Sequence, residues 1–552
     1  MTHTLDDRVK LSVLGGLGEI GLNMLVFECA GQALVVDAGM MFAAERALGI
    51  DVIVPRLTYL ERVRPKLLGI IVTHGHEDHI GAVPYLLRQF PAPVYGDELS
   101  LGFVRRRLRE NELEAELRPV KPYSRLVLGP FTVEFIPVTH SIPGSFALAI
   151  TTAAGLIIHT GDFKIDDSPV DGKPFDREAF RRLGERGVTL LLSDSTNAEQ
   201  VGRTPSESSL RTVLRDLLSR AKGRVFLSIF SSHLHRIRQL AELSLELGRF
   251  VVPVGRRMVE SVRLGLEFGP LQPVAQAFMS LQDTDFLPIN RVAYLVSGSQ
   301  GEPLSALVKI AAQAYPGVRV SEGDTVILSS RFIPGNERAI HALVDQLFRH
   351  GADVYYETIA PVHVSGHASS GELAEMIQLT RPKYFIPVHG EYRHLSHHRR
   401  LAIQCGVPEK NCLLLQDGDS VVLKAGEIRR ADAVEFGRVM VAGSEMVDEE
   451  LVKERLALAR RGAVIVSLAL SRATGKLVAP PEIHCCGLFA GDGANLQVRR
   501  AGEELAEWLE RADRSVLASP ERLKGEVERA LGAYFRHEFG LSPVVMPCVV
   551  EI

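Results

Sequence analysis

Residues 74–79 read His-Gly-His-Glu-Asp-His and gather metal-binding side chains in one short turn. The turn directly follows the apolar run 67–72, which has the composition of a buried strand. His74 and His76 can face one point in space, and Asp78 and His79 can face a second. Imidazole nitrogen combined with carboxylate oxygen suits zinc and also accommodates manganese. These residues therefore predict a metal centre.

Three further ligand-type residues, His140, Asp162 and His389, each come directly after a run with strand-like patterning. A merely solvated polar loop at 73–79 would need no matching ligands elsewhere in the chain. Each metal site needs about three protein ligands and an open position for water. We therefore expect two sites that share a carboxylate: His74, His76 and His140 at the first, Asp78, His79 and His389 at the second, and Asp162 as the bridge between them.

The elements that must position these ligands fall into two groups. The ligand-bearing strands are expected at 67–72, 131–139, 155–161 and 384–388. Between Asp162 and His389 the pattern alternates between helix and strand, with helices at 208–220 and 235–247 and strands at 223–230 and 249–254. Such alternation predicts a parallel α/β domain inserted into the first fold. The first fold must then resume, with a helix at 372–379 and strands at 384–388 and 420–424.

The C-terminal part of the chain has a separate pattern. A charged helix is expected at 449–461, followed by an apolar strand at 463–470, a helix around 503–512 and a final strand at 544–552. This part is predicted to form a small α/β unit of its own.

The glycine-rich segment 16–21 fits the G-x-G-x-x-G pattern of dinucleotide-binding folds, and Asp37 lies roughly twenty residues further on. A dinucleotide site requires a helix that starts at the glycines. Residues 23–29 and 33–37 instead alternate like two strands around the turn 30–32. A hairpin is therefore expected, and a nicotinamide cofactor is not.

The ligand set resembles that of the metallo-β-lactamase superfamily. Segments 192–197 (LSDSTN), 296–302 (VSGSQGE) and 363–369 (HVSGHAS) resemble the β-CASP branch, whose members cut nucleic acids. The glycines of 15–21 and an additional C-terminal domain are similar to the bacterial ribonuclease J family. The resemblance covers nearly all 552 residues, with fewer motifs after about residue 430.

The resemblance implies an α/β fold class: a metallo-β-lactamase αββα sandwich with an inserted β-CASP α/β domain and a small C-terminal α/β domain. The boundaries expected from the sequence are 1–205 and 361–440 for the two parts of the sandwich, 206–360 for the inserted domain, 441–462 for a linker and 463–552 for the C-terminal domain.

The chemistry expected is two-metal hydrolysis of a phosphodiester. His367, in a tight loop of glycine and serines, is the candidate donor of a proton to the leaving 3′ oxygen; a structural loop histidine is the alternative. By resemblance, Asp194 orients a neighbouring histidine, although a helix cap or Asx turn would also explain it. Asp78 counts among the catalytic residues as well as the ligands. Asp37 is expected to support the ligands from behind.

By resemblance, a pocket for a terminal 5′-monophosphate is also expected. Its residues would come from two loops: Ser231, Ser232 and His233 from the first, and His363, Val364, Ser365, Gly366 and His367 from the second. Backbone amides and hydroxyls can hold one phosphate without a basic side chain. Serine-rich loops are usually plain turns, so this expectation depends on the resemblance. It implies 5′-to-3′ exonuclease activity on single-stranded RNA, with endonuclease activity besides, in RNA maturation and decay.

Composition favours a cytoplasmic enzyme without a membrane segment. The formal net charge is −4, so no global field attracts a polyanion, and RNA would have to meet local basic groups. The candidates are 104–109, Arg331 with Arg338, and 393–400; each alone is more typical of a solvated helix face. No run of about 18 apolar residues and no secretory signal is present. The six cysteines have no zinc or disulfide spacing and are expected to be reduced.

Two other function classes remain open: a small-molecule metallo-hydrolase of thioesters or lactones, and an inactive RNA-binding subunit. The inserted domain argues against the first, because it would roof the metals and form a channel. The complete ligand set argues against the second. The sequence does not decide between zinc and manganese, RNA and DNA, or exonuclease and endonuclease action. The resemblance further implies a homodimer or dimer of dimers, partners in an RNA-degradation complex, and a structural calcium ion near 48–51.

Overall fold

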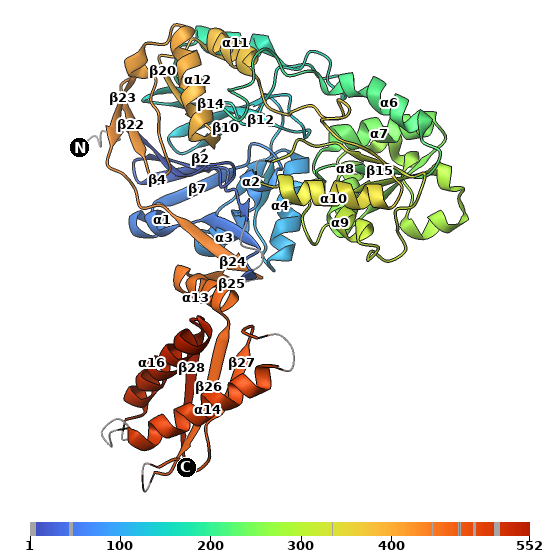
Figure 1. Cartoon of the computed structure of the whole chain (residues 1–552). Helices are drawn as coiled ribbons and strands as arrows, with labels where there is room; N and C mark the ends of the chain where they lie inside the picture. The colour runs from blue at the N-terminus through green and yellow to red at the C-terminus, as the bar shows by residue number, and fades with distance from the viewer. Residues whose placement is uncertain are drawn as a thin grey trace, which may run out of the picture. The chain divides into compact units, whose positions relative to one another are not determined.

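The computed structural model describes residues 7–43, 48–333, 335–443, 445–472, 474, 476–489, 493–512 and 519–552 (Figure 1). The chain divides into two compact units. The first combines Met1–Phe42 with Ile53–Arg438, and the second combines Ala43–Val52 with Val439–Ile552. Within the described ranges, no helix combines the length and the apolar character that crossing a lipid bilayer requires.

The first sheet of the larger unit has eight strands in the order β23-β22-β1-β3-β4-β7-β8-β9. Their bounds are β1 Val9–Gly15, β3 Met24–Cys29, β4 Gln32–Val36, β7 Lys66–Ile71, β8 Val94–Gly96, β9 Leu117–Pro119, β22 Ser420–Lys424 and β23 Glu427–Ala431. Strands β3 and β4 form the predicted hairpin, in which Cys29 pairs with Gln32 and the turn residues Ala30 and Gly31 have positive φ. No helix follows the glycines; β2 (Leu17–Gly18) pairs instead with β21 (Gly390–Glu391). The dinucleotide interpretation is thereby excluded.

The second sheet has six strands in the order β10-β11-β12-β13-β14-β20. Their bounds are β10 Arg125–Leu128, β11 Phe131–Pro137, β12 Phe146–Thr152, β13 Gly155–His159, β14 Val188–Asp194 and β20 Tyr384–Val388. One apolar cluster joins the facing sides of both sheets, including Phe27 and Val36 of the first and Phe135 and Ile386 of the second. The outer face of the second sheet packs on helices α5 (Arg177–Glu185), α11 (Ser370–Thr380) and α12 (Tyr392–Gln404).

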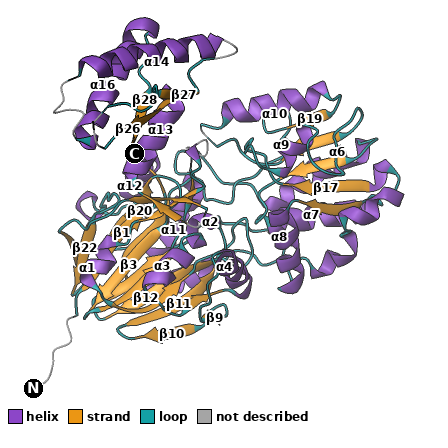
Figure 2. Cartoon of the chain, turned by 90° about the horizontal axis from the view of Figure 1, so that it is seen from below, coloured by secondary structure: helices purple, strands orange, loops and turns teal. Residues whose placement is uncertain are grey.

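Helices α1 (Thr58–Val63), α3 (Val83–Gln89) and α4 (Glu98–Glu110) belong to the first sheet's side of the sandwich (Figure 2). The αββα sandwich predicted from the resemblance is therefore present. In the second sheet, β14 and the edge strand β20 pair in parallel, with Leu190 opposite Tyr384, although the inserted domain separates them in sequence. Being buried on both faces, both strands are almost continuously apolar.

The inserted domain is a five-stranded parallel sheet in the order β16-β17-β15-β18-β19. The strands are β15 Val225–Ser228, β16 Phe250–Val254, β17 Val292–Val296, β18 Thr325–Leu328 and β19 Asp353–Tyr355. Its helices are α6 Leu210–Arg220, α7 Leu234–Glu246, α8 Arg256–Glu267, α9 Ala306–Ala311 and α10 Glu337–Arg349. The helix–strand alternation predicted for this region is confirmed.

The smaller unit holds its own three-stranded sheet, β27-β26-β28. Its elements are α13 Glu449–Arg461, β26 Ala463–Leu470, β27 Glu482–Cys486, α14 Gly493–Arg511, α16 Pro520–Phe539 and β28 Val544–Glu551. The predicted strands and charged helix are present, whereas α14 starts earlier than expected and α16 was missed. The buried positions of α16, Leu523, Val527, Leu531 and Phe535, recur every four residues, so the helical signal was readable.

Candidate functional site

The predicted ligands come together at the carboxyl ends of the sandwich strands. The turn after β7 brings His74 to His79, the loops after β11 and β13 bring His140 and Asp162, and His389 directly follows β20. Three groups of convergent ligand atoms result: His74, His76, His140 and Asp162 in the first, Asp78, His79, Asp162 and His389 in the second, and Asp162, Asp194, His367 and His389 in the third. The third was not expected from the sequence, whereas the first two were.

In the first group, three ring nitrogens lie close to one another. His74 Nε2 lies 3.0 Å and His140 Nε2 lies 3.2 Å from His76 Nδ1. A zinc ion about 2.0–2.1 Å from each nitrogen spaces tetrahedral ligands about 3.3 Å apart. The three nitrogens thus fit a tetrahedral divalent ion.

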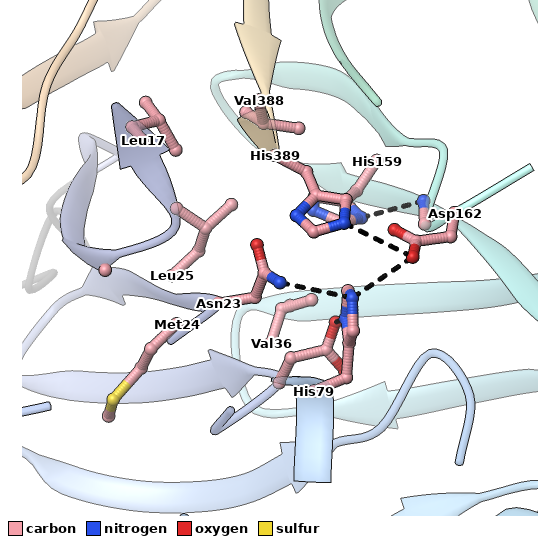
Figure 3. Close-up of a pocket in the computed structure, with 13 residues that line it drawn as sticks. Leu17, Asn23, Met24, Leu25, Val36, His79, His159, Asp162, Val388 and His389 are labelled. Carbon is pink, nitrogen blue, oxygen red and sulfur yellow. Dashed lines mark hydrogen bonds and ion pairs between the residues drawn. The ribbon is translucent and has the colours of Figure 1, made fainter. Parts of the chain in front are cut away.

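In the second group, Asp78 Oδ2 lies 3.7 Å from Nε2 of both His79 and His389. Asp162 Oδ2 lies 3.3 Å from His79 Nε2 and 3.4 Å from His389 Nε2. The same oxygen is 3.5 Å from His74 Nε2 and 3.8 Å from His140 Nε2. One carboxylate oxygen therefore faces both groups, and Figure 3 shows Asp162 between His79 and His389.

The other ring nitrogens of three histidines are occupied, which fixes their tautomers. His79 Nδ1 lies 2.8 Å from Asp37 Oδ2, and His140 Nδ1 lies 2.8 Å from the Gly366 carbonyl oxygen. His74 Nδ1 lies 3.1 Å from Thr73 Oγ1, whose hydroxyl donates to Asp37. Donation from Nδ1 leaves the lone pair of each Nε2 for a metal. At His79 the Asn23 Nδ2 amide lies 3.2 Å from this nitrogen. Asp37 therefore lies where the sequence analysis expected, behind the ligands.

Two residues of the site have backbone conformations that residues other than glycine rarely adopt. Asp37 has φ of 60° and His389 has φ of 54°, both in the left-handed region. Each such conformation costs about 1–3 kcal/mol and persists only where surrounding structure enforces it. Here the Asp37 amide donates to the Ile71 carbonyl, and His389 directly follows the buried strand β20. Both residues lie beside the convergent ligand atoms, although other non-glycine residues away from them, such as Glu112 and Tyr123, also have positive φ.

His367 lies beside the convergent ligands. Its Nδ1 is 2.8 Å from Asp194 Oδ2 and 4.0 Å from Asp162 Oδ2. Asp194 also accepts the Thr196 amide at 3.0 Å, so it makes the Asx turn and orients the histidine at once. Burial lowers the pKa of His367, but the carboxylates of Asp194, Asp162 and Asp78 outweigh it and raise that pKa to about 9. The ring is thus held as a proton donor.

The loop that carries His367 is held by several neighbours. Asn197 Nδ2 donates to Ser365 Oγ at 2.8 Å and to the His367 carbonyl at 3.1 Å. The Thr204 hydroxyl donates to the same carbonyl at 2.7 Å. A Cβ at Gly366 would lie 2.8 Å from His140 Cε1, so only glycine fits against this ring. A larger residue at 366 would therefore disturb a metal ligand as well as the loop.

The other predicted phosphate-binding residues lie at the start of α7. Ser231 and Ser232 are half-buried, and His233 is the N-cap of this thirteen-residue helix. Neither ring nitrogen of the buried His233 has a hydrogen-bond partner among the described residues. Burial keeps the pKa of His233 well below its usual range. The charges of nearby groups act in the same direction, from Arg236, His235, His363 and His76. An amide-rich helix start beside an unpartnered histidine suits an anion.

Sequence reasoning missed several buried charged residues around the site. Glu372 is completely buried, and its carboxylate accepts the backbone amides of Ile165 at 2.8 Å, Thr204 at 2.6 Å and Ser369 at 3.0 Å. It ties together the loops that carry Asp162 and His367. The Ser-x-x-Glu capping box at 369–372 was a visible signal for part of this role. Arg236, Glu207 and Lys164 had no comparable signal.

Several arginines of the predicted basic segments 104–109 and 393–400 form ion pairs with glutamates. Arg107 pairs with Glu110 at 2.6 Å and with Glu77 at 3.4 Å, and Arg106 also pairs with Glu77. Arg393 likewise pairs with Glu199 at 3.2 Å. Arg331 is exposed and reaches Asn197 Oδ1 at 3.5 Å. Arg331 is therefore the basic group best placed to meet a polyanion near His367.

The turn expected to hold calcium lies in the smaller unit. Asp51 Oδ2 accepts the Gly443 amide at 2.8 Å. Among the described residues, the groups of three or more convergent ligands do not include Asp51. The calcium ion stays a prediction.

Comparisons with protein families match four segments of the chain. Residues 18–223 match the model of the metallo-beta-lactamase superfamily, 222–347 the ribonuclease J beta-CASP domain, 351–410 a Zn-dependent metallo-hydrolase RNA specificity domain, and 450–552 the ribonuclease J C-terminal domain. A crystal structure of a protein of unknown function from Enterococcus faecalis shares the fold, with a TM-score of 0.54 at 16% identity over 75% of this chain and 100% of that one. The fold and site define a metallo-β-lactamase-fold protein of the β-CASP class.

Comparison with individual proteins identifies the family within this class. Ribonuclease J of Synechocystis is 39% identical over 99% of this chain and 87% of its own length. Ribonuclease J of Mycolicibacterium smegmatis is 37% identical over 99% and 97%, and that of Helicobacter pylori is 37% identical over 98% and 79%. The chain belongs to the ribonuclease J family.

Proposed function

We propose that this protein is a metal-dependent ribonuclease that hydrolyses phosphodiester bonds with two divalent ions. Zinc is the first candidate for these ions and manganese is the second. The observation that carries the proposal is the position of Asp162 Oδ2, within 3.3–3.8 Å of Nε2 of four histidines. Bound there, two ions would generate a nucleophilic hydroxide and stabilise charge on the phosphate oxygens. Membership of the ribonuclease J family supports RNA as the substrate.

In this proposal the chain's own residues position the reacting groups. Asp37 orients His79, and the Gly366 carbonyl orients His140. His367, held by Asp194, is the group that gives a proton to the leaving 3′ oxygen, and its raised pKa supports this role. Asp78 contributes as a ligand of the second site.

The proposal extends to the RNA end. Ser231, Ser232, His233 and the loop 363–367 form the pocket for a terminal 5′-monophosphate, which would make the enzyme a 5′-to-3′ exonuclease with additional endonuclease activity on single-stranded RNA. The unpartnered His233 at the start of α7 supports this part of the proposal, within the part of the chain that the structure describes.

Processive degradation should prefer 5′-monophosphate RNA over 5′-triphosphate RNA of the same sequence. Two additional phosphates need space and compensating donors, and without them their burial is costly. Identical RNAs with hydroxyl, monophosphate and triphosphate ends are compared by mononucleotide release. Internal cleavage, which does not use the pocket, is the control and should vary less. Equal exonuclease rates on all three ends would refute the pocket.

Two other functions are disfavoured. A thioester or lactone hydrolase would not need the inserted domain of residues 222–347, and an inactive RNA-binding subunit would not need the complete ligand set. A chelator-sensitive assay on 5′-labelled RNA, run beside a generic thioester, separates the three.

The proposal also includes a cytoplasmic homodimer or dimer of dimers, with the boundaries near residues 205, 360, 440 and 462. Alternate residues of β26, such as Val464 and Leu468, pack into the unit's own core. A dimer contact through this sheet would therefore use other residues, such as the exposed Met546 and Val550 of β28.

Truncation after about residue 445 should give a monomer with weakened activity, because it removes this sheet. Light scattering measures the mass, and the untruncated protein at equal concentration is the control. A truncated chain that remains a dimer with full activity would place the interface in the larger unit.

A further inference from the structure

Arg236, in α7, is one of the largest completely buried side chains of the protein. Its Nε and Nη2 donate to the two oxygens of Glu207, at 2.7 and 2.8 Å. Nη1 donates to the Ser329 carbonyl at 2.7 Å. The two parallel hydrogen bonds to the carboxylate offset the cost of burying the charges of Arg236 and Glu207. A buried arginine with so many partners fixes the segments around it.

The same guanidinium reaches the loop that precedes His367. Nη1 lies 3.1 Å from His363 Nδ1, and Nη2 donates to the Val364 carbonyl at 3.2 Å. Arg236 is three residues beyond His233, at the start of α7. One side chain therefore links both loops of the phosphate pocket.

The contact with His363 has a chemical consequence. A guanidinium has no acceptor and does not lose its proton in proteins. His363 Nδ1 must therefore accept, which leaves the proton of the neutral ring on Nε2. Burial and the charge of Arg236 keep the pKa of His363 well below its usual range, although the Ser329 carbonyl acts in the opposite direction. His363 is only half-buried.

We propose that Arg236 is a positioning residue that holds His363 as the Nε2–H tautomer, so that this nitrogen donates a hydrogen bond to the terminal phosphate of the RNA. This inference rests on the proposed 5′-monophosphate pocket. A neutral donor in a fixed direction distinguishes one phosphate oxygen, whereas a mobile lysine would attract any phosphate along the chain.

The other charged groups near His363 fit this assignment. Lys164 and Arg331 both act on the ring electrostatically. Lys164 is buried against Asp166 at 3.3 Å, so its charge is already balanced. Glu207 lies 3.7 Å from His233 Nε2 and is neutralised by Arg236. Lys164, Glu207 and Arg236 are thus charge-balanced, whereas the exposed Arg331 contacts the neutral Asn197.

His367 does not depend on Arg236 for its position. Asn197, Thr204 and Glu372 hold its loop by separate hydrogen bonds. Loss of Arg236 should therefore appear in KM for end-phosphorylated RNA far more than in kcat, a split that general loosening of the active site would not give.

The test uses the full-length, metal-loaded enzyme and RNAs that differ only in a 5′-monophosphate or 5′-hydroxyl end. Arg236→Met/Glu207→Gln removes both buried charges together, and Arg236→Lys keeps the charge while losing the fork. Arg249→Met is the matched control, because Arg249 is also buried in the inserted domain but donates to backbone carbonyls, including Gly223 at 2.9 Å. Thermal unfolding identifies variants that do not fold.

For either folded Arg236 variant, the monophosphate preference in kcat/KM should fall about 10- to 100-fold, the range of one hydrogen bond to a charged group. The loss should lie mainly in KM, and Arg249→Met should keep the wild-type preference. His363→Ala should cause a similar loss, and combining it with Arg236→Lys should add little, because both act through one bond.

Three outcomes would overturn the inference. The first is an Arg236→Lys enzyme with the wild-type preference. The second is a loss that multiplies when His363→Ala is added, since it would mean that Arg236 acts by another route. The third is a wild-type enzyme with no monophosphate preference, which would remove the pocket itself and with it the exonuclease part of the proposed function. If the wild-type enzyme prefers the monophosphate end and the Arg236 variants keep that preference, only the role of Arg236 is refuted.

Discussion

Asp162→Ala should lose both metal ions and reduce RNA cleavage to background, while the fold survives. Its Oδ2 faces Nε2 of four histidines, so its removal opens both coordination sites at once. The loops around it remain tied by Glu372, which bonds the Ile165 amide. Metal content is measured on the purified protein, and thermal unfolding reports the fold.

Asp167→Ala is the matched control, because Asp167 lies five residues further on, is exposed and pairs with Arg177. It should keep two ions and normal turnover. His76→Ala should be as inactive as Asp162→Ala, since it removes a direct ligand. Two tightly bound ions and normal turnover in Asp162→Ala would refute the bridging role.

His367→Ala should keep its metals and bind RNA, but its turnover should fall by roughly 10²–10⁴-fold, the usual range for a lost general acid. The ring lies 2.8 Å from Asp194 and belongs to neither of the two groups predicted to hold metal, although it converges with Asp162, Asp194 and His389 in the third group. Single-turnover rates at saturating RNA measure the chemical step.

Asp194→Asn provides a second arm of this experiment. It keeps the shape of the side chain but removes the charge that favours protonated His367, so turnover should fall in the same direction. Near-wild-type rates for His367→Ala would mean that water or metal alone stabilises the leaving group.

The ligands could be predicted because each one ends a strand. Strands β11, β13 and β20 run in the same direction in one sheet, so His140, Asp162 and His389 follow them at the same edge, where they meet the turn 74–79 of the other sheet. Period-two patterning at 23–37 likewise predicted a hairpin and removed the dinucleotide alternative. Both inferences use regular structure, which sequence periodicity encodes.

The supporting residues could not be predicted in this way. Arg236, Glu207 and His363 lie far apart in sequence and on irregular or unrelated elements, so no period relates them. The pairing of Arg107 with Glu77 also depends on tertiary packing. It balances part of the positive charge of the segment 104–109, of which Arg105 and Arg109 stay exposed. Gly366 was recognisable as a loop glycine, but its contact with His140 follows only from the folded chain.

The most direct test combines metal analysis with mapping of cleavage products from 5′-monophosphate, single-stranded RNA. The purified enzyme should contain two divalent ions per chain and release mononucleotides from the 5′ end. Chelation should abolish cleavage of RNA, and adding back zinc or manganese should restore it. An enzyme that cleaves RNA at full rate after its metals are removed, or that hydrolyses a thioester and leaves RNA intact when metal-loaded, would contradict the proposal of a two-metal ribonuclease.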